Sequence, residues 1–389
     1  MVAPLFNRRS VLTQAGLIGC SLAASPLVTP MAFAKAPWET RLVVIILRGG
    51  LDGLDVVRPQ GDPAFADLRP KLNAGNDPID LNGYFALHSG MAALMPLWHR
   101  GELGFVHAVS TPYRDKRSHF DGQDLLEAGT DRLSGTVRDG WLNRMLQLVP
   151  GLEADTAYAI GNDALRVLEG PAPVANWAPE ANLRLSPQAL QLAQLVMERD
   201  PQMHAALAEA LMLSQDAEGD RRGGRAHEQI ARFAASRLRQ DARVAAFSLN
   251  GWDTHRAQGR ALRRSLGVLS DTILTLRQDM GATIWEKTAV VAVTEFGRTA
   301  RENGTGGTDH GTGGVMIMAG GAISGGKVHG QWPGVGPSAL YDGRDLMPTG
   351  DVRAALGWIM RGLTGIGTPD LTQTVFPGLD MGSDAGLLR

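Results

Sequence analysis

The sequence predicts an α/β fold with a mainly parallel central sheet, helices on both faces and a helical insertion. Three observations predict it: short apolar runs recur along the chain, helical patterns separate them, and polar residues follow the ends of the runs. With 389 residues, 44% of them hydrophobic and 20% charged, the chain has enough apolar material for a large core. A net charge of -2 gives no indication of a nucleic-acid partner.

Residues 1–34 are predicted to be a signal peptide that is not part of the fold. Arg8 and Arg9 precede a mildly apolar stretch, which ends at the small-residue cleavage site Ala32, Phe33 and Ala34. Paired arginines resemble the twin-arginine signal, which is read by an export machinery that carries folded proteins. Polar residues interrupt the apolar stretch, so no stable membrane span is expected. We therefore expect a periplasmic or secreted protein whose single domain covers residues 35–389.

The one cysteine, Cys20, lies inside this leader in the sequence LIGC. That sequence resembles a lipoprotein cleavage box, so lipid anchoring at Cys20 is the alternative to cleavage after Ala34. The apolar run continues past Cys20, which favours cleavage. The mature chain then has no thiol, which excludes disulfides, thiolate ligands and a cysteine nucleophile.

Five apolar runs are expected to be strands. The first, residues 42–47, is a continuous β-branched run that ends in glycines, which is typical of a buried parallel strand. The other four are residues 103–109, 244–249, 288–294 and 315–320. Open α/β sheets bind ligands in the loops at the carboxyl ends of such strands.

Three segments have the periodicity of helices, namely residues 118–129, 186–215 and 256–280. The region of residues 151–225 contains few strand-like runs and closes with a hydrophilic stretch. We expect this region to be a helical insertion that covers one side of the sheet.

Clusters of polar residues follow the predicted strands. They are Asp52 with Asp55, Ser118 with His119, Asp253 with His255, Glu295 with Arg298, and Asp309 with His310. Carboxylates gathered at one edge of a sheet repel each other unless a cation lies among them. Oxygen and nitrogen ligands without sulfur suit a divalent metal such as Zn, Mn, Mg or Ca. The alternative is that these are turn-forming aspartates and surface histidines.

Ser118 is predicted to begin a helix, where free backbone N–H groups and the helix dipole favour negative charge. A serine hydroxyl becomes a nucleophile when a metal or a base takes its proton. The alternative is that Ser118 only caps the helix, with Asp121 completing a pattern similar to a capping box.

Three arginines stand near these clusters. Arg117 and Arg298 have the planar fork of donors that binds an anionic ester, although solvated surface positions are the alternative for both. Arg48 ends the first predicted strand, where burial would require a partner for its charge.

The sequence also resembles two known groups of proteins. The stretches LVVIILRGGLDGLD, GDPAFADLRP, GELGFVHAVSTPYRDKRSHFDGQDLLEAG, TEFGRTARENG and GGTDHGTGG resemble the twin-arginine-exported bacterial family called domain of unknown function 1501. That family name implies no activity. The order of the polar clusters is more distantly similar to the alkaline phosphatase and sulfatase superfamily.

The second resemblance implies a role for each cluster. Ser118 would be the nucleophile, and the metal ligands would be Asp52, Asp253, His255, Glu295 and His310. The segment GTDHGTGGVMIM is similar to one in phosphopentomutases whose histidine binds metal, which implies that His310 is a ligand.

This chain also departs from the superfamily pattern. Arg48 stands where the first aspartate usually falls, Phe296 replaces an expected histidine, and Asp253 is closer to His255 than is usual. A single-metal site and a metal-free site therefore both stay open beside a two-metal site.

The sequence thus predicts an exported hydrolase of phosphate or sulfate esters, in which Ser118 attacks and Arg298 grips the ester oxygens. Its substrate would be an anionic ester of a small molecule or a glycan. The alternative is a non-catalytic envelope protein that binds a glycan or an anionic ligand on the same scaffold.

Overall fold

The computed structural model describes residues 36–74, 77–114, 117–133, 137–149, 151–161, 165–178 and 225–389. The predicted signal peptide with Cys20 and the helical pattern expected at residues 186–215 lie outside the described residues.

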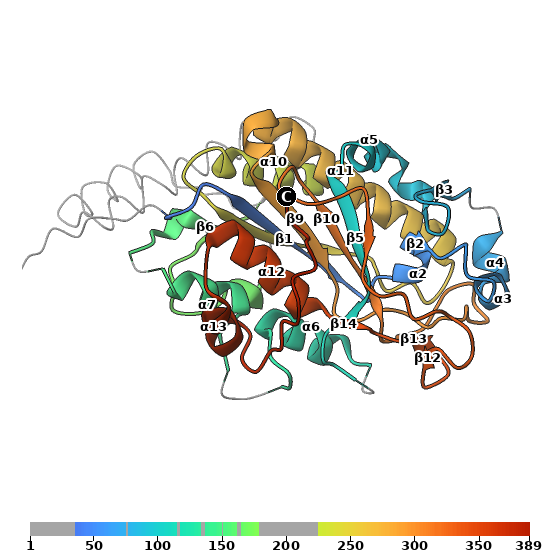
Figure 1. Ribbon diagram of the computed structural model, residues 1–389. Coiled ribbons are helices and arrows are strands. Elements are labelled where there is room, and N and C mark those ends of the chain that lie inside the picture. Colours follow the sequence, from blue (N-terminus) through green and yellow to red (C-terminus); the bar gives the residue numbers. More distant parts are fainter. Residues whose placement is uncertain are drawn as a thin grey trace, which may run out of the picture.

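One large sheet organises the described part of the chain (Figure 1). Its strand order is β11-β5-β10-β9-β1-β8-β6-β7, and β14 also pairs with β5. Strand β1 lies near the middle and pairs in parallel with β8 and β9. The nine strands described are β1 (Arg41–Arg48), β5 (Leu103–Ser110), β6 (Ala157–Ile160), β7 (Ala175–Trp177), β8 (Val244–Asn250), β9 (Thr288–Val293), β10 (Gly314–Ala319), β11 (Val328–His329) and β14 (Gly350–Asp351).

All five strands expected from apolar runs are present, as β1, β5, β8, β9 and β10. The sheet is mainly parallel, and the exception is β10, which runs antiparallel to both β5 and β9. The predicted α/β class is therefore confirmed. Strand β1 is buried along its whole apolar stretch, which explains its continuous β-branched sequence.

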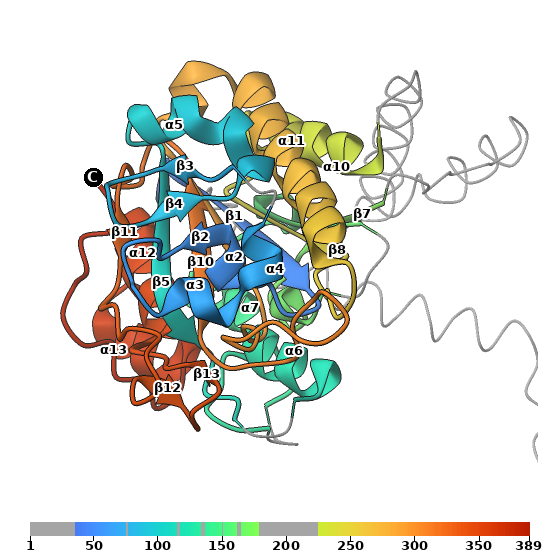
Figure 2. The ribbon, with the colours of Figure 1, turned by 90° about the vertical axis from the view of Figure 1, so that its right-hand side faces the viewer.

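Helices cover both faces of the sheet (Figure 2). Side chains alternate along β1, so Val43 and Ile45 pack on one face with α5 (Met95–His99), α10 (Ala226–Leu238) and α11 (Gln258–Trp285). The intervening Val44 and Ile46 pack on the other face, where the helices are α6 (His119–Ala128), α7 (Trp141–Gln147) and α12 (Val352–Thr364). The sheet is thus buried between two apolar layers.

The start of the expected helical insertion differs from the prediction. Residues 157–160 and 175–177 form β6 and β7, which extend the main sheet beyond β8. Strands of four and three residues are too short to leave a clear period in the sequence. Residues 179–224, which make up most of the expected insertion, lie outside the described part.

Short elements complete the fold. The small strands are β2 (Val57–Arg58), β3 (Ile79–Asp80), β4 (Ala86–Leu87), β12 (Leu340–Tyr341) and β13 (Asp345–Leu346). The short helices are α2 (Gly53–Val56), α3 (Phe65–Leu68), α4 (Pro70–Asn73) and α13 (Thr368–Asp370), with helical turns at Ser89–Leu94, Ala154–Thr156, Arg166–Leu168 and Leu371–Val375. Of the helices described, none combines the length and the apolar character that crossing a membrane requires.

Candidate metal centre

The loops that follow β1, β8 and β9 meet at one edge of the sheet. Strand β10 runs the opposite way, so the residues that precede it, including His310, lie at the same edge. The loops approach each other closely: a Cβ at Gly49, whose φ is +123°, would lie 2.6 Å from the backbone nitrogen of Asp253. One at Gly307 would lie 2.3 Å from the carbonyl oxygen of Thr254. Glycine is required at both positions because no other residue leaves the space.

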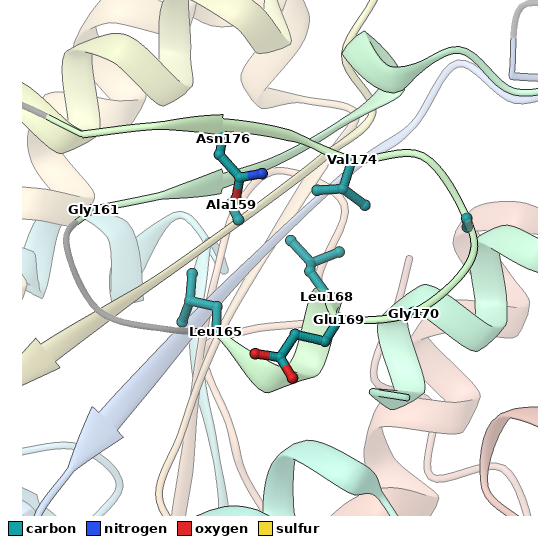
Figure 3. A pocket seen from close by; sticks show the side chains of 9 residues that line it. Ala159, Gly161, Leu165, Leu168, Glu169, Gly170, Val174 and Asn176 are labelled. Atoms are coloured by element: carbon teal, nitrogen blue, oxygen red, sulfur yellow. The ribbon is translucent and has the colours of Figure 1, made fainter. Parts of the chain in front are cut away.

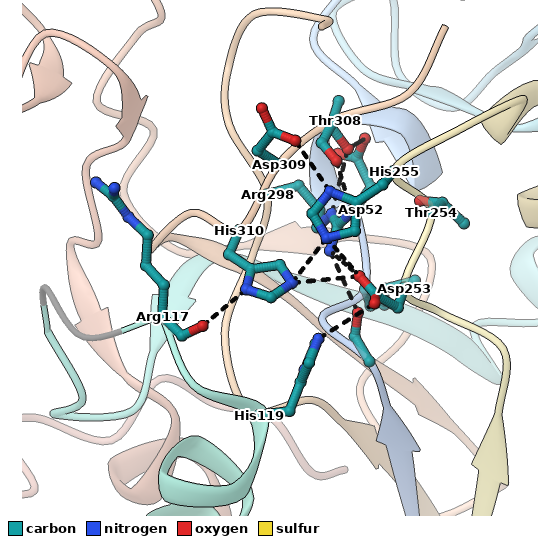
Figure 4. Close-up of polar contacts among 12 residues, drawn as sticks. Asp52, Arg117, His119, Asp253, Thr254, His255, Arg298, Thr308, Asp309 and His310 are labelled. Atoms are coloured by element: carbon teal, nitrogen blue, oxygen red, sulfur yellow. Dashed lines mark hydrogen bonds and ion pairs between the residues drawn. The ribbon is translucent and has the colours of Figure 1, made fainter. Parts of the chain in front are cut away.

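Three histidines and an aspartate converge at this edge (Figure 4). Nε2 of His255 lies 3.0 Å from Nε2 of His310 and 3.0 Å from Oδ1 of Asp253. Nε2 of His310 lies 3.2 Å from the same carboxylate oxygen. Nε2 of His119 lies 3.4 Å from Oδ2 of Asp253. We call these four residues the histidine cluster.

The second nitrogen of each ring in the histidine cluster has a partner that can only accept a hydrogen bond. The pairs are Nδ1 of His119 with Oε1 of Glu295 at 2.8 Å, Nδ1 of His255 with Oδ1 of Asp309 at 2.9 Å, and Nδ1 of His310 with the carbonyl oxygen of Arg117 at 2.8 Å. In a neutral ring the proton then lies on Nδ1, and Nε2 presents a lone pair to the centre of the cluster. This is the arrangement by which metal-binding histidines are oriented in proteins.

The spacing and exposure of the cluster fit a metal ion. Two nitrogens bound to one tetrahedral zinc at about 2.0–2.1 Å lie roughly 3.4 Å apart, close to the separation of the His255 and His310 nitrogens. The side chains of Asp253 and His255 are 45% and 40% exposed. Solvent thus reaches the cluster, as in metal sites that keep a position open for water or substrate. The four residues are therefore candidate metal ligands.

Glu295 lies behind His119 with its side chain fully buried. Its Oε1 also accepts from the backbone N–H of Gly49 at 2.9 Å, and its Oε2 accepts from the Thr294 hydroxyl at 2.8 Å. Burial opposes ionisation, but hydrogen bonds, including those from His119 and Thr294, outweigh it and lower the pKa of Glu295. The hydrogen bond with Glu295 raises the pKa of His119. Glu295, predicted as a ligand, thus contacts the ring of His119 and not the centre of the cluster.

Arg298 holds the carboxylate of Asp253. Its Nη1 donates to Oδ1 of Asp253 at 2.9 Å and its Nη2 donates to the carbonyl of Thr308 at 2.6 Å. Burial acts to raise the pKa of Asp253, but the hydrogen bond from Arg298 outweighs it and the pKa is lowered. The guanidinium is buried, so in this structure it positions Asp253 and does not reach toward a substrate.

Ser118 adjoins the histidine cluster along the chain, between His119 and the Arg117 carbonyl that binds His310. It is the N-cap of α6, and its hydroxyl accepts from the backbone N–H of Asp121 at 3.4 Å. The capping role, which was the alternative for this serine, is therefore present in the structure. The side chain of Arg117 points away from the cluster (Figure 4).

Asp52 does not join the histidine cluster. Its buried Oδ2 accepts from Nη1 of Arg69 at 2.8 Å and from Nε2 of Gln258 at 2.6 Å.

Arg48 has the partner that its burial requires. Nη1 of Arg48 lies 2.8 Å from a carboxylate oxygen of Glu127. The sequence thus predicted correctly that Arg48 requires a partner.

The sequence pattern predicts neither a ligand role for His119 nor a role of its own for Asp309. His119 directly follows the predicted nucleophile, and nothing in that position marks its ring as a ligand. The usable signal is that each histidine of the cluster lies within two residues of another polar residue of the predicted edge: Ser118, Asp253 or Asp309.

A pocket of about 300 Å³ lies away from this edge, between β6, β7 and the turn at Arg166–Leu168 (Figure 3). Glu169 is the one titratable residue among the described residues that line it. This lining offers too few convergent polar groups to compete with the histidine cluster as the functional site.

No curated protein matches the sequence. Similar solved structures include the lipoteichoic acid synthase LtaP from Listeria monocytogenes, with 10% identity, 96% of this chain and 82% of that chain covered, and a TM-score of 0.42. A protein in the alkaline phosphatase superfamily from Vibrio parahaemolyticus has 10% identity over 92% of this chain and 75% of its own, with a TM-score of 0.36. The C-terminal periplasmic domain of EcEptC from Escherichia coli, in complex with Zn, has 9% identity over 72% and 73%, with a TM-score of 0.33.

These TM-scores are too low to support a functional argument. The family described as "Protein of unknown function (DUF1501)" matches residues 108–356. That range is more than half of the chain and contains the whole histidine cluster. This chain therefore belongs to the DUF1501 family.

Proposed function

We propose that this protein is a metal-dependent hydrolase of phosphate or sulfate esters, exported by the twin-arginine route. The observation that carries the proposal is the convergence of the Nε2 atoms of His119 and His310 on the Asp253 carboxylate. Nε2 of His255 lies 3.0 Å from both His310 and Asp253, and each Nδ1 is held by an acceptor. His119, Asp253, His255 and His310 would hold one divalent ion. Glu295 and Asp309 would orient two of the rings from behind.

Zinc fits this donor set best among the four candidate metals. Imidazole nitrogens suit zinc, whereas magnesium, calcium and manganese prefer sites made mainly of oxygen ligands. A bound divalent ion lowers the pKa of a nearby hydroxyl and takes up negative charge that develops on an ester oxygen.

Ser118 is the proposed nucleophile. Its oxygen would bond to the phosphorus or sulfur as the alcohol oxygen of the substrate leaves, and water would then release the phosphate or sulfate. At the start of α6, the free N–H groups of the first turn and the helix dipole favour the anionic ester. Arg298 would act through Asp253, whose carboxylate it holds in place.

One observation favours the rival, a non-catalytic envelope protein that binds a glycan or an anionic ligand. Phe296 is 2% exposed, and its ring packs against those of His119 and His310 at centroid distances of 5.1 and 5.0 Å. An apolar ring therefore stands where the superfamily resemblance implies another metal ligand.

Elemental analysis and turnover of aryl phosphates and aryl sulfates decide between the two candidates. The enzyme should contain about one metal ion per chain, and both Ser118→Ala and Ser118→Asn should lose almost all turnover. Asparagine caps helices as well as serine does, so Ser118→Asn separates the hydroxyl's chemistry from its capping role. Metal-free, inactive protein would support the binder, and full turnover in both variants would remove Ser118 from the mechanism.

A further inference from the structure

The side chain of Gln258 joins the two loops that carry three of the four candidate ligands. Gln258 is the first residue of α11 and is fully buried. Its Oε1 accepts from the hydroxyl of Thr254 at 2.9 Å and from the hydroxyl of Thr308 at 2.7 Å. Thr254 lies between Asp253 and His255, and Thr308 lies two residues before His310. One oxygen atom therefore ties both ligand loops together.

The amide nitrogen of Gln258 is anchored on the opposite side. Its Nε2 donates to Oδ2 of Asp52 at 2.6 Å and to Oδ2 of Asp55 at 2.8 Å. Arg69 and Arg58 form ion pairs with these two carboxylates. The amide thus uses both of its donors and both lone pairs of its oxygen, which fixes its orientation.

The surroundings require glutamine at this position. A glutamate would bring a third carboxylate against Asp52 and Asp55, and like charges at that distance in a buried site are strongly unfavourable. An asparagine is shorter by one methylene group and could not span the four partners. Thr254 and Thr308 are 2% and 0% exposed, so water does not replace a lost contact without rearrangement.

We propose that Gln258 is a positioning residue that sets the separation of the two ligand loops and thereby the affinity of the histidine cluster for its metal. This inference rests on the proposed metal site. Loss of the shared acceptor would leave the Thr254 hydroxyl without this partner and the Thr308 hydroxyl with only its longer contacts, to Asp52 at 3.4 Å and from Arg298 at 3.3 Å. Asp253, His255 and His310 would then be held less firmly around one point. Outer contacts of this kind typically change metal affinity by about 10- to 100-fold.

Cobalt(II) binding tests the proposal, because its visible absorption reports the geometry of the ligands as well as the affinity. Gln258→Met, which keeps the length of the side chain but removes the amide, should bind cobalt about 10- to 100-fold more weakly and with an altered spectrum. The matched control is Thr272→Val, which removes the hydrogen bond of a buried threonine in the same helix to the carbonyl of Val268 at 2.7 Å. It should leave both the Kd and the spectrum unchanged.

A double-mutant cycle shows whether the effect passes through the threonine hydroxyl. Thr254→Val should weaken cobalt binding in the unaltered background but have no further effect in Gln258→Met. An unchanged Kd and spectrum in Gln258→Met, or fully additive effects, would overturn this inference alone. Absence of cobalt binding by the unaltered protein would overturn the proposed function as well.

Discussion

Nε2 of His255 and Nε2 of His310 lie 3.0 Å apart, although the Nδ1 atoms of both rings already have acceptor partners. A neutral imidazole carries one proton, so two lone pairs face each other across this distance. Such a contact is unfavourable unless a cation lies between the nitrogens, or one ring takes a second proton. The proximity of Asp253 to both atoms is consistent with a cation that all three share.

Removal of either ring should abolish tight metal binding. We expect His255→Ala and His310→Ala each to weaken zinc binding by more than the ~10- to 100-fold typical of outer contacts, because a direct ligand is lost. Competition with a chelator of known affinity measures the change. His329→Ala is the control, since the Nε2 of His329 is paired with the carbonyl of Ser324 in another part of the fold. Equal zinc affinity in His310→Ala and the control would contradict the assignment.

Glu295 should matter for metal affinity without being a ligand. Glu295→Gln keeps the shape of the side chain but removes the charge that accepts the proton of His119 Nδ1, so we expect zinc affinity to fall about 10- to 100-fold. Glu127→Gln alters a second buried glutamate, which pairs with Arg48, and should change stability with little effect on zinc binding. Isothermal titration of both variants makes the comparison, and equal affinities would argue against the role given to Glu295.

Arg298→Lys tests the pair of guanidinium hydrogen bonds by which Arg298 holds Asp253. A lysine has one ammonium group and cannot donate from two fixed positions to Asp253 and to the carbonyl of Thr308. We expect a loss of roughly 1–3 kcal/mol in the free energy of unfolding of the metal-free protein, from the buried group that loses its partner. Zinc affinity should fall in the same variant. Urea unfolding in the presence of a chelator measures the first effect, and unchanged stability would show that this pair of hydrogen bonds is dispensable.

The free energy of unfolding should depend on pH through His107, a histidine outside the histidine cluster. His107 is buried, its Nε2 donates to the carbonyl of Val57 and its Nδ1 accepts from the N–H of Ala108, so only the neutral ring satisfies both contacts. Burial lowers the pKa of His107 from 6.5 to about 4. The folded state therefore disfavours protonation, and the stabilisation, complete above pH 6.5, is lost as the pH falls toward 4.

The loss assigned to His107 is about 3 kcal/mol between pH 7 and pH 4. In His107→Gln the side chain at this position does not titrate in this range. As the pH is lowered from 7 to 4, the unfolding free energy of this variant should therefore fall less steeply than that of the unaltered protein. Parallel pH series of denaturant unfolding check this difference. Identical slopes would show that His107 contributes nothing to the pH dependence.

The strands could be predicted where burial on both faces leaves a continuous apolar run, as in β1 and β9. The direction of β10 could not, because an apolar run reads the same for parallel and antiparallel strands. Strands β6 and β7 escaped prediction because they are short and contain small or polar residues at the edge of the sheet.

Part of the candidate site could also be predicted. Asp253, His255 and His310 lie together because the loops that carry them meet at one edge of the sheet. The sequence reveals this arrangement because the apolar runs mark where the strands begin and end. Asp52 pairs with Arg69 and does not join the histidine cluster. Tertiary packing decides where the Arg69 side chain lies, and the sequence does not reveal that position. The role of His119 depended on how α6 enters the edge, which no spacing in the sequence specifies.

The reversed direction of β10 has a consequence for the segment that carries His310. The chain leaves the sheet after Val293 and re-enters it at Gly314 on the same rim, so no crossover helix is needed to bring it back. Both ends of this excursion are anchored in neighbouring strands, and His310 lies close to the second anchor. Mutations in the middle of the segment between Val293 and Gly314 can therefore change which ligands reach the histidine cluster, while β9 and β10 keep their structure.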